Sequence, residues 1–292
     1  MASGLIFALL CLLCTGLNDV VFKAYAARSR SRGTYVFGIG LIWLLLQLVL
    51  LQGGDFELTF SKTSVAYGVV AGLLVTAANL LLIESLTRID ASLGSTIYRL
   101  NSVGVVLLSL VLLGEPLGIY KTLGVLAGIA AVFLLYRKDH SAGGAASGLG
   151  MRTFSFFFTL AVLASLLRAL YGVVSKAALT AGACLQTLIF IAAVSWIAGG
   201  AAYAILVERR FQISGKVLAY AASSGALVFL IVNFLMGAID RAQASTAIPI
   251  SNMGFVLALL IAMALGMERL TWRKVLAVVA SVCSVLLLSM VF

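Results

Sequence analysis

The segment 63–86, TSVAYGVVAGLLVTAANLLLIESL, contains one charged side chain, Glu84, within an otherwise apolar or weakly polar run. As a helix it would rise about 36 Å at 1.5 Å per residue, whereas the hydrocarbon core of a bilayer is about 30 Å thick. The segment is therefore long enough and apolar enough to cross a membrane. It predicts an integral membrane protein.

The rest of the chain has the same character. Of its 292 residues, 63% are hydrophobic and 10% are charged, and the mean hydropathy is +1.16. A soluble domain carries roughly 25% charged residues, so this chain has too few polar side chains to coat a globular surface. The composition also excludes a disordered chain, which requires low hydrophobicity.

Ten segments satisfy the length and hydropathy of a membrane helix, and the chain is predicted to be an all-α integral membrane protein with ten transmembrane helices. They are 4–27, 34–51, 63–86, 91–113, 118–136, 153–179, 183–207, 216–239, 243–266 and 272–292. The longest hydrophilic stretch, 137–152, is rich in Gly, Ala and Ser and is predicted to be a flexible linker. It separates 1–136 from 153–292, and each part holds five predicted spans.

The net charge of +10 results from 20 Lys and Arg against 10 Asp and Glu. Thirteen of the 20 basic residues follow odd-numbered spans: Arg28, Arg30, Arg32, Arg88, Arg137, Lys138, Arg152, Arg209, Arg210, Lys216, Arg269, Arg273 and Lys274. Because basic loops stay cytoplasmic, the charge count predicts that both termini are extracytoplasmic in a plasma membrane, here a bacterial inner membrane. The excess positive charge is explained by orientation, and we expect no nucleic-acid partner.

The two halves align when the sequence is shifted by 153 positions. Lys23 then meets Lys176, Trp43 meets Trp196, and Asp55 meets Glu208 with its charge retained. Since each half holds an odd number of spans, the second must be inverted relative to the first. Inverted repeats are an architecture of secondary transporters, with the substrate site near the midplane. The alternative is an old duplication that now serves only as a scaffold.

The residues that end the first half resemble a known family. The segment 114–117 (GEPL), followed by Lys121, Gly124 and Gly128, resembles the end-of-repeat signature of EamA-type proteins, within the drug/metabolite transporter superfamily. The second half repeats it at 268–271 with Lys274. There Met267 is inserted, and Ala277 and Ser281 replace the glycines. Pro249 also resembles the proline of the family's ninth helix.

The resemblance implies a five-plus-five topology in which the fifth and tenth helices are peripheral. It also implies transport without ATP and without a cofactor, and the chain has no phosphate-binding loop of the type GxxxxGK[ST]. Many members are similar in having cytoplasmic termini. That orientation conflicts with the charge count, so both orientations stay open.

One layer of the predicted bilayer collects polar side chains from three spans, and we take them as substrate-binding candidates. Its members are Asn18, Asp19, Asn79, Tyr98, Arg99 and Asn101. Arginine stays ionised and offers a fork suited to carboxylate or phosphate, so Arg99 is the leading candidate. Arg99 pairs permanently with Asp19 and locks two helices, or it holds an anionic substrate group while Asp19 accepts an ammonium or a proton. The two roles are compatible if the pair opens when substrate binds.

A second candidate set is predicted nearer the other face of the membrane. It comprises Arg168, Tyr171, Asn233, Ser251 and Asn252. Pro249 removes a helical hydrogen bond beside Ser251, which is tolerated where the backbone lines a cavity. A kink with locally satisfied amides would explain the same pattern.

Metal and enzyme sites are not expected. Cys11 and Cys14 form a CxxC within an apolar run, but no second pair lies nearby, and the one histidine, His140, falls in the linker. The carboxylates are scattered, so no acid–base or metal-ligand cluster forms along the sequence.

These features predict a secondary transporter, and we expect an exporter. The substrate would be a small polar metabolite, anionic or zwitterionic, because Lys23, Arg99, Arg168 and Lys176 outnumber Asp19 and Glu84 within the spans. The expected partners are the substrate, the lipid bilayer and, if Asp19 couples transport, protons; facilitated diffusion is equally compatible. A monomer and a homodimer both fit. The alternative is a lipid-headgroup flippase or an accessory subunit of one.

Overall fold

In the computed structural model, the regular elements of the part of the chain that it describes are all helices. This part comprises residues 2–26, 31–53, 58–89, 94, 97–98, 100–112, 114, 118–136, 150–242, 244–252, 254, 257, 261 and 272–290. Several predictions fall outside these residues: the role of Arg99, most of the linker, and the motif residues at 115–117 and 268–271.

The helices of the first half are α1 (Ala2–Ala26), α2 (Arg32–Gln52), α3 (Lys62–Ser85), α5 (Asn101–Leu112) and α6 (Ile119–Tyr136). Those of the second half are α7 (Met151–Thr180), α8 (Leu185–Ala202), the π-helix η1 (Tyr203–Val207), α9 (Gly215–Arg241), α10 (Ala244–Asn252) and α12 (Trp272–Ser289). Most bounds lie within a few residues of the predicted spans. α7 begins at Met151, inside the predicted linker, with Gly150 as its N-cap residue.

Within the described ranges, six helices are long and apolar enough to cross a membrane, including Gly4–Tyr25, Lys62–Ser85 and Arg152–Thr180. Asn101–Leu112 and Ile119–Ala131 are shorter apolar helices. The prediction of an all-helical membrane protein is therefore confirmed, whereas the count of ten spans stays a prediction.

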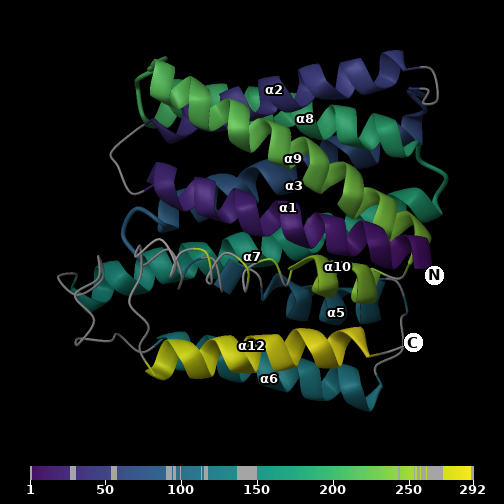
Figure 1. Cartoon of the computed structure of the whole chain (residues 1–292), viewed down its shortest axis with the longest axis vertical. Coiled ribbons are helices and arrows are strands. Elements are labelled where there is room, and N and C mark those ends of the chain that lie inside the picture. The colour runs from purple at the N-terminus through teal and green to yellow at the C-terminus, as the bar shows by residue number, and fades with distance from the viewer. Residues whose placement is uncertain are drawn as a thin grey trace.

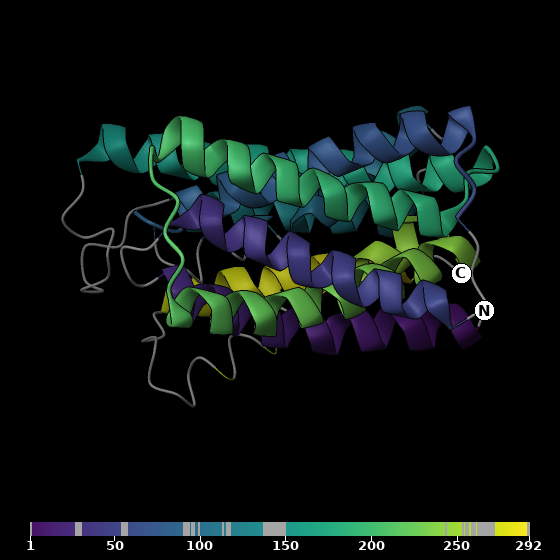
Figure 2. The ribbon, with the colours of Figure 1, turned by 90° about the horizontal axis from the view of Figure 1, so that it is seen from above.

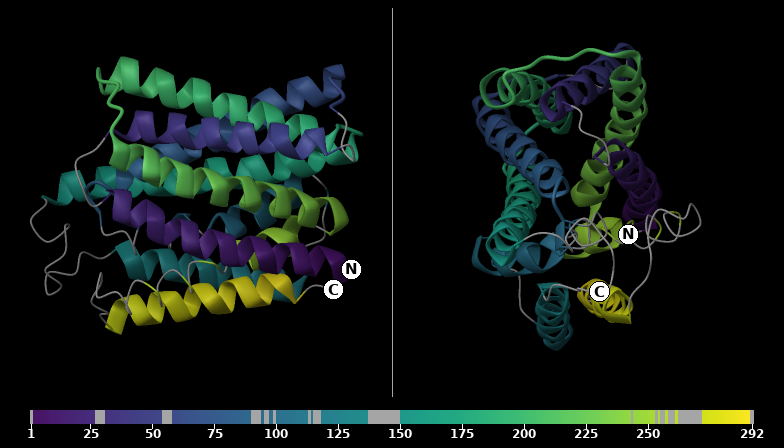
Figure 3. Two further views of the ribbon diagram at one scale, coloured as in Figure 1. Left: turned by 45° about the horizontal axis from the view of Figure 1, so that its top comes forward. Right: turned by 90° about the vertical axis from the view of Figure 1, so that its left-hand side faces the viewer.

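The helices lie side by side and nearly along one direction (Figures 1 and 2). α1 begins and α12 ends at the same end of this bundle, which we call the terminal face. The opposite end carries Arg32, Arg88, Arg152, Arg209 and Arg210, and we call it the basic face. α6 and α12 pack on each other along one edge, apart from most of the other helices (Figure 3).

The most extensive contacts join the two halves. α3 packs on α7 and α1 packs on α9, while α2 packs on α8. The rings of Trp43 and Trp196, which the 153-residue shift pairs, meet edge to face with their centroids 5.9 Å apart and an interplanar angle of 85°. Residues at equivalent positions thus touch each other at the centre of the α2–α8 contact.

Glycines permit the close approach of α2 to α8 and to η1. A Cβ added at Gly200 would lie 2.3 Å from the backbone nitrogen of Phe37, and one added at Gly33 would lie 2.3 Å from that of Ala204. Small residues at helix crossings allow backbones to come together in membrane proteins. No side chain other than hydrogen fits at these two positions without separating the helices.

The turn that follows α8 was not predicted. The segment 183–207 was expected to be one regular helix, but its last five residues form the π-helix η1. Arg209 then adopts a φ of 50°, a left-handed conformation that is uncommon for residues other than glycine. Together these two features turn the chain so that Glu208 reaches the N-terminus of α2.

Candidate functional site

A cavity, which we call the central cavity, lies between helices of both halves. It encloses about 480 Å³ of empty space, counting its open mouth. Six polar residues line it: Thr15, Asn18, Asp19, Asn79, Tyr98 and Arg168. The apolar part of its wall comprises Phe22, Trp43, Val75, Leu82, Trp196, Val228, Ile231 and Val232. A small molecule with one polar and one apolar side matches this division.

A second cavity adjoins the first and shares Thr15 and Arg168 with it; its empty space of about 310 Å³ includes its open mouth. We call it the terminal-side cavity, because Cys11 in its wall precedes Thr15 by one helical turn toward the start of α1. Its other lining residues are Asn101, Tyr171, Gly172, Leu235, Ile248, Ser251 and Asn252. The two polar sets that the sequence predicted as separate layers are therefore contiguous.

Arg168 connects the two sets. Its guanidinium carbon lies 5.0 Å from the centroid of the Tyr171 ring, in the geometry of a cation–π contact. Among the described residues, no carboxylate lies within ion-pair distance of Arg168. A half-buried guanidinium that borders two cavities can therefore take an anionic group from a bound molecule.

Hydrogen bonds order the amide side chains around these cavities. Asn79 donates through Nδ2 to the carbonyl of Val75 over 2.7 Å and accepts from the Tyr98 hydroxyl over 3.5 Å. Asn252 donates through Nδ2 to Asn101 Oδ1 over 2.6 Å. These bonds join predicted site residues from different helices.

Ser251 and Asn252 are both buried, and they extend the polar wall of the terminal-side cavity. The Ser251 hydroxyl donates to the carbonyl of Ala247 over 2.9 Å. Asn252 also donates to Ser102 Oγ over 2.9 Å. The expectation that these two residues border a cavity therefore agrees with their positions.

Several buried polar atoms in the cavity walls have no hydrogen-bond partner in the described part of the chain. They are Asn18 Oδ1, Asn101 Nδ2, the Tyr171 hydroxyl, and the indole nitrogens of Trp43 and Trp196. An unsatisfied buried polar group costs about 1–3 kcal/mol, so native proteins keep few of them. A molecule in the cavities can satisfy these donors and acceptors.

Asn233 lies elsewhere, outside the walls of both cavities. It donates to Gln47 Oε1 over 2.9 Å, and Gln47 donates to Gln186 Oε1 over 2.6 Å. These three amides link α9, α2 and α8, and Gln47 is fully buried. The sequence did not single out the two glutamines, because they are 139 positions apart and no local pattern shows that they meet.

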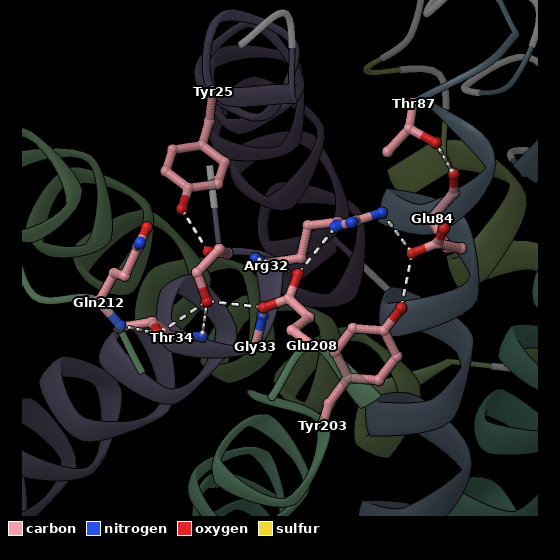
Figure 4. Close-up of polar contacts among 10 residues, drawn as sticks. Tyr25, Arg32, Gly33, Thr34, Glu84, Thr87, Tyr203, Glu208 and Gln212 are labelled. Atoms are coloured by element: carbon pink, nitrogen blue, oxygen red, sulfur yellow. Dashed lines mark hydrogen bonds and ion pairs between the residues drawn. The ribbon is translucent and has the colours of Figure 1, made fainter. Parts of the chain in front are cut away.

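A network of hydrogen bonds and ion pairs, which we call the ionic network, joins helix ends at the basic face (Figure 4). The Glu208 carboxylate accepts from Ser31 Oγ over 2.6 Å, from the backbone N–H of Arg32 over 2.9 Å and from that of Gly33 over 3.2 Å. It lies at the N-terminus of α2, where the helix dipole favours a negative charge. Its side chain is 3% exposed.

Arg32 extends this network to a third helix. Its Nε donates to Glu208 over 2.9 Å and its Nη1 donates to Glu84 over 2.5 Å. The Tyr203 hydroxyl also donates to Glu84, over 2.5 Å. In the sequence, Arg32 counted only as one of the basic loop residues that predict orientation. No local pattern shows that Glu84 and Glu208, from distant segments, lie beside it.

The environment of Glu208 shifts its pKa. Burial alone would raise the pKa, but the hydrogen bonds from Ser31, Arg32 and Gly33 outweigh it and hold the pKa below its ordinary value. A carboxyl whose pKa is lower in the folded state stabilises the fold at pH values above its unfolded pKa, about 4.3, and loses this contribution as the pH falls through the folded pKa.

We therefore expect Glu208→Gln to lower the free energy of unfolding at pH 7 by about 1–2 kcal/mol. This loss of stability should shrink as the pH falls below about 5, because the wild-type carboxyl becomes protonated at acid pH. Thermal unfolding in detergent across this range measures the effect. Asp240→Asn is the matched control, since the Asp240 side chain is 47% exposed. A constant difference between wild type and Glu208→Gln at all pH values would contradict the prediction.

Comparisons with known proteins agree with this architecture. Residues 2–137 match the EamA-like transporter family, which confirms the resemblance seen in the sequence. No curated protein gives a significant sequence match. A solved structure, titled only "Crystal structure of protein", has a TM-score of 0.74 and 14% identity, and the alignment covers 98% of this chain and 96% of that one. At this level of identity the similarity concerns the fold alone.

Proposed function

We propose that this protein, whose first half is an EamA-like domain, is a secondary transporter. It moves a small anionic or zwitterionic metabolite by alternating access between two inverted five-helix halves. The observation that carries the proposal is the position of Arg168 in the wall shared by two cavities. This half-buried cation has no carboxylate partner among the described residues.

The chemistry of the walls supports this substrate class. An ionised side chain within a membrane span costs at least a few kcal/mol and generally marks a pathway or a pair. The Arg168 guanidinium suits a carboxylate or phosphate, which it can bind through two parallel hydrogen bonds. Asp19 lines the central cavity together with Arg168, so an ammonium group of the substrate or a coupling proton has an acceptor there.

The contacts between the helices support the inverted arrangement. The pairs α3–α7 and α9–α1 exchange under the 153-residue shift, and both are among the most extensive contacts. The edge-to-face contact of Trp43 with Trp196 is expected where two equivalent helices cross near a pseudo-two-fold axis. In transporters of this kind the substrate site lies at the interface between the repeats. Trp43 and Trp196, one from each half, both line the central cavity.

Purified protein in liposomes tests the proposal. Radiolabelled amino acids, dicarboxylates and phosphorylated metabolites would be supplied singly, with and without a pH gradient. We expect at least one compound to enter faster than into protein-free liposomes and to be displaced by its unlabelled form. Asp19→Asn should remove any dependence on the gradient.

The same liposomes distinguish the alternative function. If none of the compounds enters but a fluorescent phospholipid is moved between leaflets, the protein is a lipid flippase and the proposal is wrong. If neither moves, the proposal is also wrong.

A further inference from the structure

We infer that the ionic network and the aromatic layer beneath it form a gate at the basic face, whose bridging arginine and ring stack are not repeated by their counterparts in the other half. This inference rests on the proposed transport function, and it goes further by assigning different closures to the two ends. The central cavity is then closed on one side by ion pairs between helices. On the other side, no ion pair between two helices joins residues that the structure describes.

The aromatic layer begins in the wall of the central cavity. Phe22, which lines that cavity, packs against Tyr35 with ring centroids 5.7 Å apart. Tyr35 stacks on Tyr25, with centroids 3.8 Å apart and an interplanar angle of 15°. Tyr220 packs edge to face on Tyr25. These rings come from α1, α2 and α9, so they obstruct the route from the cavity toward the basic face.

The ionic network covers this layer and is bonded to it. The Tyr25 hydroxyl donates to the carbonyl of Ser31 over 2.5 Å, and Ser31 Oγ donates to Glu208. Arg32 joins Glu208 to Glu84 at the end of α3. The ends of α1, α2, α3 and η1 are therefore held together by one continuous set of bonds (Figure 4).

The repeat preserves only part of this closure: Glu208 has the counterpart Asp55, which lies outside the described residues, whereas the residues that Glu208 and the rings contact are not preserved. In an inverted-repeat transporter, the residues that close one face have counterparts near the other face. Under the 153-residue shift, Arg32 corresponds to Leu185 and Glu84 to Gly237. The three aromatic residues Phe22, Tyr25 and Tyr35 correspond to Ser175, Ala178 and Leu188. Neither the bridging cation nor the ring stack can form from these counterparts.

This asymmetry sets the expected resting state. Opening the basic face requires Arg32 to leave Glu84 or Glu208, which breaks charge-assisted hydrogen bonds between helices. Near the terminal face, the described ion pair joins the sequence neighbours Asp240 and Arg241. The helices there are joined instead by Lys176, which donates to the carbonyls of Ile239 and Ala242 over 3.0 and 3.1 Å, contacts with neutral acceptors that are weaker than the carboxylate pairs of Arg32. Without substrate, the cavities are therefore accessible mainly from the terminal face.

Thiol labelling tests this inference without a substrate. The four native cysteines would be replaced by serine, and Thr15→Cys would place one thiol in the wall shared by both cavities. A charged, membrane-impermeant maleimide would be added to sealed vesicles of each orientation. We expect labelling from the terminal face to be at least about tenfold faster than from the basic face. Glu84→Gln should raise the rate from the basic face by about tenfold.

Two further variants sharpen the outcome. Arg32→Gln should raise basic-face labelling at least as much as Glu84→Gln, because it breaks both ion pairs. Arg152→Gln, at an exposed arginine of the same face, should leave the rate unchanged. If Arg32→Gln fails to fold, Glu84→Gln still decides the question.

The inference is overturned if wild-type labelling is equal from both faces. It is also overturned if Glu84→Gln leaves basic-face labelling unchanged, since the network would then only stabilise the fold. Transport of a labelled compound by protein with equal labelling would reject the gate and keep the proposed function. One-sided labelling without transport would keep the gate and reject the proposed function.

Discussion

Arg168→Ala is expected to reduce uptake of an anionic or zwitterionic substrate by about 100-fold. Arg168 borders both cavities and has no carboxylate partner in the described ranges, so a bound anion is its natural counterion. Charge-assisted hydrogen bonds contribute about 1.5–3 kcal/mol, which corresponds to this factor when a bidentate contact is lost. The measurement is initial uptake into proteoliposomes of whichever compound the wild type moves.

Arg168→Lys separates charge from geometry in the same assay. Lysine keeps the positive charge but not the planar fork, so we expect an intermediate rate, about tenfold below wild type, with a raised apparent KM. Arg152→Ala should transport at the wild-type rate, because Arg152 is exposed at the basic face. If folded Arg168→Ala protein transports with unchanged apparent affinity, the role of Arg168 is confined to its contact with Tyr171.

Gly200→Ala is expected to cause the largest loss of stability. The new Cβ would lie 2.3 Å from the backbone nitrogen of Phe37, and a backbone cannot move aside as a flexible side chain can. Overpacking in a dense interior costs about 1–3 kcal/mol and occasionally more, and here α2 and α8 would have to separate around the Trp43–Trp196 contact. We expect a cost at or above the upper end of that range, measured by thermal unfolding in detergent and by the yield of monodisperse protein.

Gly215→Ala is the matched control for this prediction. Gly215 begins α9, and an added Cβ there meets nothing within 4 Å. Because alanine favours helix by about 1 kcal/mol over glycine, this variant should be neutral or slightly more stable. Equal stability of the two variants would show that α2 and α8 are farther apart at Gly200 than in the structure.

Much of the candidate site could be predicted from the sequence. Polar residues within long apolar segments are few, so Asn18, Asp19, Asn79 and Tyr98 could be selected and assigned to one layer by depth. The structure places these four in the wall of the central cavity. Arg168 was assigned to a separate layer, because depth along a helix does not show which helices are neighbours.

The apolar part of the site could not be predicted in the same way. Phe22 and Val75 resemble dozens of other apolar residues in this chain, and no local pattern marks the few that face a cavity. Trp43 and Trp196 could be paired through the repeat, but their contact depends on how closely the glycines let α2 and α8 approach. Asn233 was predicted as a site residue on its polarity, yet its position on α9 directs it to Gln47.

The sequence by itself indicated a membrane protein whose first half resembles EamA-type proteins, because hydropathy and motif spacing are properties of short segments. The tertiary structure decided which polar residues share a cavity and which helix ends are joined. Arg32 and Glu208 are 176 positions apart, and Gln47 and Gln186 are 139 apart. Such partners meet only after the helices have packed, because the geometry of packing depends on side chains from both halves together.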